Sequence, residues 1–151
     1  MNGQTARRPL DILVVDDNPG DIRLTAEALK DEEPQNSLHT ARDGVEAINF
    51  LRRTGRYGDA PRPDLILLDL DMPRMGGLQV LAEIKRDKAL KDIPVVILTG
   101  SHEIEDVVKT YNLHANCYIT KPIELDQFTK MVKSVTNFWL TIVNCQRRTA
   151  N

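Results

Sequence analysis

The chain has 151 residues, a formal net charge of −2 at pH 7 and two cysteines. This length fits one domain with a real hydrophobic core, and the mixed charges give no sign of a partner such as nucleic acid. No apolar stretch reaches the roughly 20 residues that span a bilayer, and Cys117 and Cys145 do not suggest a disulfide framework, so a cytoplasmic protein without membrane contact is expected.

Strand-like and helix-like segments alternate five times along the chain. Short apolar runs set between helical patterns are typical of strands buried in a parallel sheet. The strands are expected at Leu10–Val15, Ser37–Ala41, Leu65–Leu68, Val95–Leu98 and Cys117–Thr120. The helices are expected to begin at Asn18–Pro19, after Asp43–Gly44, at Gly77, near His102 and near Glu124. Asn18 is expected to be the N-cap of the first helix, with Pro19 at its first helical position. Right-handed crossovers then predict an α/β fold, a doubly wound, five-stranded parallel sheet between two layers of helices.

The domain organisation follows from the same pattern. Residues 1–9 are expected to form a flexible arm, residues 10–143 one domain and residues 144–151 a tail. The segment Thr54–Pro63, between the second helix and the third strand, holds two glycines, two prolines and several charges. It is predicted to be a loop.

Polar residues follow four of the predicted strands. Asp16 and Asp17 come after the first strand, Asp69 after the third, Thr99 after the fourth and Lys121 after the fifth. The carboxyl ends of parallel strands share one edge of a sheet, where ligands bind. These five side chains are therefore expected to converge in a single site.

The chemistry of such a site depends on its charges. Two carboxylates about 4 Å apart repel by ~1 kcal/mol in water and by ~4 kcal/mol at an effective dielectric of about 20. A divalent cation that prefers oxygen ligands would offset this repulsion, and Mg2+ is the natural candidate.

The chain has no glycine-rich phosphate loop and no Gly-x-Ser-x-Gly motif, which leaves a carboxylate as the nucleophile. Asp69 attacking a phosphoryl group would form an acyl phosphate, with Mg2+ and Lys121 neutralising the transferred oxygens and the Thr99 hydroxyl in position to bond one of them.

In their order and intervals these residues resemble the response-regulator receiver domain of two-component signalling, over about Leu10 to Val143. The resemblance implies the (βα)5 flavodoxin-like fold and makes Asp69 the phospho-acceptor. It further implies that Asp17 and Asp69 bind Mg2+ directly, together with the main-chain carbonyl of Asp71. Asp16 would act on the metal largely through water.

The resemblance also implies roles for residues in the second half of the chain. Thr99 and Tyr118 would be the paired switch residues that respond to phosphorylation, and Lys121 would bind the phosphate. The peptide bond between Lys121 and Pro122 would be cis. Such a domain phosphorylates itself and can lose its phosphate, but it is not a turnover enzyme.

The implied partner is a histidine kinase. The segments Asn18–Asp21, Thr54–Pro63 and His114–Tyr118 are similar to those of the small stand-alone regulators that partner phytochrome-type histidine kinases.

The sequence ends without an output domain, so output is expected through protein contact. The last helix has a second set of apolar residues besides its core stripe, which predicts a homodimer. The interface would combine the helix near His102, the strand Cys117–Thr120 and this last helix.

Two alternatives use the same residues. The segment Leu68–Met72 resembles the Asp-x-Asp motif of haloacid-dehalogenase-type phosphatases, in which Asp71 would be the general acid and base. Against it, Pro73 stands where that motif has threonine or valine, and the chain has no room for a cap domain. The other alternative is a pseudo-receiver that only binds partners. Such a protein is expected to lack part of the acidic set or the lysine, and here all of them are present.

Overall fold

The computed structural model describes residues 10–29, 37–70, 76–99 and 117–120, together with residues 126 and 130. All five predicted strands are present, and none of their boundaries differs from the prediction by more than one residue. The predicted helix near His102 lies outside the described residues, and the last helix is described only at residues 126 and 130, both helical. No helix in the described ranges is long and apolar enough to cross a membrane. The elements are β1 (Asp11–Val15), α1 (Pro19–Leu29), β2 (Ser37–Ala41), α2 (Gly44–Arg52), the 3-10 helix η2 (Gly55–Tyr57), β3 (Leu65–Asp69), α3 (Gly77–Arg86), β4 (Val95–Thr99) and β5 (Cys117–Thr120).

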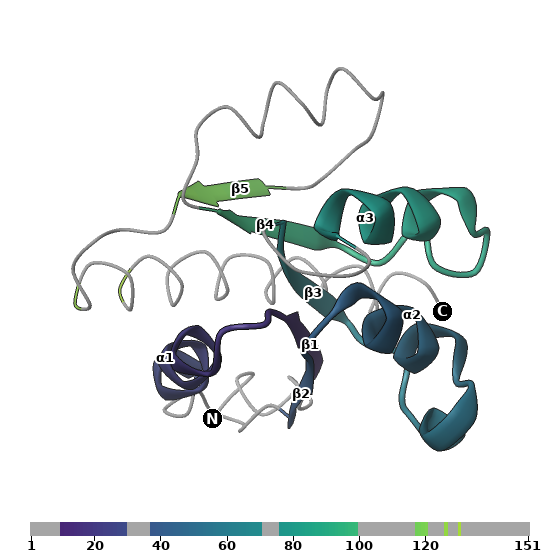
Figure 1. The fold of residues 1–151 in the computed structure, drawn as a ribbon, viewed down its shortest axis with the longest axis horizontal. Helices are drawn as coiled ribbons and strands as arrows, with labels where there is room; N and C mark the ends of the chain where they lie inside the picture. Colours follow the sequence, from purple (N-terminus) through teal and green to yellow (C-terminus); the bar gives the residue numbers. More distant parts are fainter. Residues whose placement is uncertain are drawn as a thin grey trace, which may run out of the picture.

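The five strands form one parallel sheet in the order β2-β1-β3-β4-β5. Figure 1 shows α1 on one face of this sheet and α2 and α3 on the other. The order reverses at β1, because the chain first adds β2 on one side and then continues with β3 on the other. The predicted doubly wound α/β sheet is therefore confirmed.

Two hydrophobic cores lie on opposite faces of the sheet, because successive residues of a strand point to opposite sides. Leu13 and Val15 pack with α2 and α3, whereas Ile12 and Val14 belong to the cluster that includes Ile22 of α1. Strands β1 and β3 supply both cores and are buried along almost their whole length. Such burial on both faces explains why their sequences read as continuous apolar runs rather than as alternating ones.

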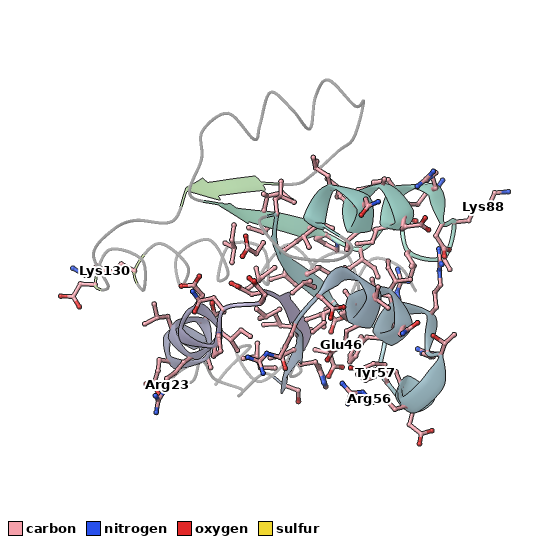
Figure 2. All side chains as sticks on the ribbon, viewed as in Figure 1. Arg23, Glu46, Arg56, Tyr57, Lys88 and Lys130 are labelled. Atoms are coloured by element: carbon pink, nitrogen blue, oxygen red, sulfur yellow. The ribbon has the colours of Figure 1, made fainter. Side chains whose placement is uncertain are left out.

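The segment after α2, predicted to be a loop, contains the short helix η2 and is attached to the domain by Tyr57. The Tyr57 ring meets Phe50 of α2 edge-on, with 5.5 Å between ring centroids. Its hydroxyl donates to Oε1 of Glu46 at 2.7 Å and accepts from Nη2 of Arg56 at 2.7 Å. Figure 2 shows the side chains of Glu46, Arg56 and Tyr57 together, where α2 is followed by η2. Burial, followed by the hydrogen bond to Glu46, raises the pKa of Tyr57. The glycines and prolines indicated a loop, but they did not reveal this aromatic anchor.

Candidate functional site

The pairing of β1 with β3 places two acidic residues beside each other. Val15 pairs with Leu68 across the two strands. The next residues of each chain segment, Asp16 and Asp69, are therefore neighbours at the carboxyl edge of the sheet. Asp69 is the last residue of β3 and pairs on its other side with Leu98 of β4.

Asp16, Asp17 and Asp69 form one cluster at this edge. Each offers a carboxylate oxygen, and the three oxygens lie within 4.8 Å of one another. Asp16 and Asp69 are almost completely buried, with relative exposures of 1% and 4%. Asp17 is the most exposed of the three. The convergence that strand-end positions predicted thus holds for the three aspartates.

Hydrogen bonds fix the turn that carries Asp16 and Asp17. The Asp16 amide donates to the carbonyl of Ala41 at 3.0 Å, which ties the end of β1 to the end of β2. Oδ1 of Asp16 accepts from the Asn18 amide at 3.0 Å. Oδ1 of Asn18 in turn accepts from the amides of Gly20 at 2.8 Å and Asp21 at 3.2 Å, which caps α1 as its sequence predicts. Asp16 therefore shapes the turn and also contributes charge to the cluster.

A glycine on α3 lies directly against the backbone of Asp69, a contact that no pattern in the sequence predicted. A Cβ atom built on Gly77 would lie 2.6 Å from the Asp69 carbonyl oxygen and 2.5 Å from Cα of Leu70. Real Cβ atoms essentially never approach other atoms within 3.0 Å. The pair Gly76–Gly77 at the predicted helix start is the one sequence signal that hints at such a close approach.

The ligand atoms of the cluster suit a hard divalent cation. Carboxylate oxygens are the donors that Mg2+ prefers, and Mg2+ commonly uses one or two carboxylates while it keeps several waters. Three negative charges within 4.8 Å of one another repel, and a bound dication offsets that repulsion. Asp16, Asp17 and Asp69 therefore fit a Mg2+ or Mn2+ site.

The other predicted site residues lie wholly or partly outside the described part of the chain. Thr99 pairs with Thr120 through the backbones of β4 and β5, so β4 and β5 also end at this edge. The side chains of Thr99 and Tyr118 are not among those described, nor are Asp71, Lys121 and Pro122. Their predicted roles remain predictions.

Comparison with known proteins places these features in one family. Residues 12–133 match the family described as the response regulator receiver domain. The response regulator Rcp1 of Synechocystis is 48% identical over 135 residues, which span 89% of this chain and 92% of Rcp1. The crystal structure of the phosphorylated cyanobacterial phytochrome response regulator RcpA has a TM-score of 0.84 at 48% identity and covers 89% of this chain and 96% of that one. The Mn2+-bound form of Rcp1 has a TM-score of 0.81 at 48% identity, with coverages of 87% and 95%.

Proposed function

This chain belongs to the response regulator receiver domain family of two-component signalling, and from that premise we propose that it accepts a phosphoryl group on Asp69 from a histidine kinase. The observation that carries the proposal is the position of Asp69. It ends the central strand β3, is 4% exposed and lies with Asp16 and Asp17 in a cluster that suits a divalent cation. A phosphoryl group arriving there meets a carboxylate nucleophile and a metal site together.

In the proposed reaction a carboxylate oxygen of Asp69 attacks the phosphorus of a phosphohistidine on the kinase. The new P–O bond forms an acyl phosphate, the P–N bond breaks, and its electron pair returns to the imidazole nitrogen. Asp17 and Asp69 would hold Mg2+ directly, together with the main-chain carbonyl of Asp71, and Asp16 would act largely through water. When bound, the metal would supply positive charge next to the transferred oxygens. The buried setting of Asp16 and Asp69 strengthens every electrostatic interaction at this edge.

The remaining predicted residues would take part in the response to phosphorylation. Lys121 would pair with the bound phosphoryl group, and the Lys121–Pro122 bond would be cis. The Thr99 hydroxyl would move to meet a phosphoryl oxygen, and the Tyr118 ring would fill the space that it vacates. Phosphorylation would thereby bias a surface with two alternative states.

The protein would not act as a turnover enzyme. The matched family gives no support to the haloacid-dehalogenase alternative.

Two relatives support a specific class of kinase as the partner of this chain. RcpA is a cyanobacterial phytochrome response regulator, and Rcp1 is a response regulator of nearly the same length as this chain. A phytochrome-type histidine kinase is accordingly the proposed phosphoryl donor, and nucleic acid is not a proposed partner.

Phosphorylation by a small donor tests the proposed function directly. Incubating the protein with Mg2+ and phosphoramidate should add the mass of one phosphoryl group, as measured by intact mass spectrometry. Asp69→Asn removes the nucleophilic oxygen and should abolish the mass shift, and chelating the metal should do the same. A wild-type protein that gains no mass would contradict the proposal, as would an Asp69→Asn variant that is still phosphorylated.

A homodimer is the proposed route from phosphorylation to output. It is supported by the second set of apolar residues in the sequence of the last helix, including Met131 and Phe138. Light scattering over a range of protein concentrations should show a monomer–dimer equilibrium, with or without phosphoramidate. A monomer at every concentration in both conditions would contradict this part of the proposal.

A further inference from the structure

We propose that Gly77 is a positioning residue for the phospho-acceptor: by lacking a side chain it lets the first turn of α3 lie against the backbone of Asp69 and so sets where the Asp69 carboxylate stands in the cluster. This inference rests on the proposed function of Asp69. It assigns a role in the reaction to a residue that offers neither a ligand atom nor a proton.

The contact involves the backbone on the strand side. The nearest atoms to a Cβ on Gly77 would be Cα of Leu70 at 2.5 Å and the Asp69 carbonyl oxygen at 2.6 Å, with Cδ2 of Leu70 also at 2.6 Å. A flexible side chain can turn away from a new methyl group, but two backbone atoms cannot. Either α3 or the end of β3 must therefore shift until these distances approach the 3.4 Å at which ordinary contact begins.

The packing of the two elements indicates which one moves. α3 is held by Val80, Leu81 and Ile84, all with 0% exposure in the core between the helices and the sheet. Lifting the helix would loosen all three. Asp69, by contrast, is the last residue of β3. The registered pairing with β4 still includes it, opposite Leu98, but the pairing with β1 stops one residue earlier, at Leu68, so one neighbouring strand holds it instead of two. The end of the strand is the less constrained partner, so the displacement falls on Asp69.

A shift of this size matters because the cluster is tight. The three carboxylate oxygens of Asp16, Asp17 and Asp69 lie within 4.8 Å of one another, a spacing that one cation can bridge. Misplacing a reacting group by about 1 Å can cost on the order of a hundredfold in rate. Gly77→Ala should therefore lower both the Mn2+ affinity and the rate of phosphorylation by phosphoramidate, each by about tenfold to a hundredfold.

The experiment separates positioning from stability with a variant of the same helix. Ile84→Val removes one methyl group from a fully buried side chain of α3 and destabilises the domain without touching Asp69. Gly58→Ala is the control for the glycine-to-alanine change, since nothing lies within 4 Å of a Cβ at that position. All variants are compared by Mn2+ titration calorimetry and by phosphorylation rate, in trimethylamine N-oxide to favour the folded state, with folding checked by circular dichroism.

Gly77→Ala is expected to fold and to lose metal affinity and phosphorylation rate, while Ile84→Val and Gly58→Ala keep values near those of the wild type. Wild-type affinity and rate in Gly77→Ala would overturn the proposal. So would an equal loss in Ile84→Val, or a Gly77→Ala chain that stays unfolded even with the osmolyte, because Gly77 would then serve folding alone. If the wild type takes up no phosphate, the proposed function fails, but the Mn2+ affinities still decide whether Gly77 positions Asp69.

Discussion

Replacing Asp17 by asparagine is expected to change metal binding and stability in opposite directions. The substitution removes a carboxylate that the proposed metal site uses, so Mg2+ affinity should fall at least about tenfold, or ~1.4 kcal/mol. The same carboxylate repels those of Asp16 and Asp69, all within 4.8 Å. Because Asp17 is the most exposed of the three, this repulsion is closer to its value in water. The metal-free variant should therefore be more stable than metal-free wild type by about 1 kcal/mol.

Chemical denaturation with and without saturating Mg2+ measures both effects. A metal ion that binds only the folded state stabilises it, and the gain grows with the ratio of the metal concentration to the Kd of the site. The wild type should therefore gain stability from Mg2+, and Asp17→Asn should gain much less. Asp59→Asn makes the same charge change at an exposed position beyond η2 and should behave like the wild type. If Asp17→Asn were less stable than metal-free wild type and kept the full response to Mg2+, the cluster would be neither repulsive nor a metal site.

Replacing Leu13 by alanine is expected to have the largest effect on folding. Leu13 is fully buried in the middle of β1, on the face covered by α2 and α3. A cavity at such a site costs about 2–5 kcal/mol, because the surrounding side chains relax only partly. Small domains are stable by only about 5–15 kcal/mol, so the variant should be close to unfolding at moderate temperature. Urea denaturation followed by circular dichroism gives the difference in free energy of unfolding.

Leu38→Ala is the matched control for this prediction. Leu38 pairs with Ile12 from the edge strand β2 and is only partly buried, so the same loss of side-chain atoms should cost about 1 kcal/mol. Similar losses for the two variants would mean that the inner strand β1 and the edge strand β2 do not differ in burial as the structure describes.

The sequence predicted the strands of this domain with little error because their signal is local. β1 and β3 are buried on both faces, so each reads as an unbroken apolar run, and a polar residue marks where each run ends. The same local pattern located Asp16, Asp17 and Asp69, since strand ends on one edge must converge once the sheet is parallel. Asn18 was predicted as a helix cap for an equally local reason, and its side chain does accept the amides of Gly20 and Asp21.

The alternation of apolar runs with helical patterns thus determined the fold class, and the polar residues at strand ends determined the acidic cluster. Contacts between distant segments were decided by the tertiary structure. The anchoring of the segment after α2 depends on where Tyr57 meets Phe50 and Glu46, which no local pattern encodes. The close approach of Gly77 to Asp69 depends on how α3 packs across β3, and a glycine in a sequence does not reveal which backbone lies beside it. The residue types along the sequence identify the reactive carboxylate of Asp69. Its position to within an ångström is set by packing, because only the folded chain brings Gly77 against the backbone of Asp69.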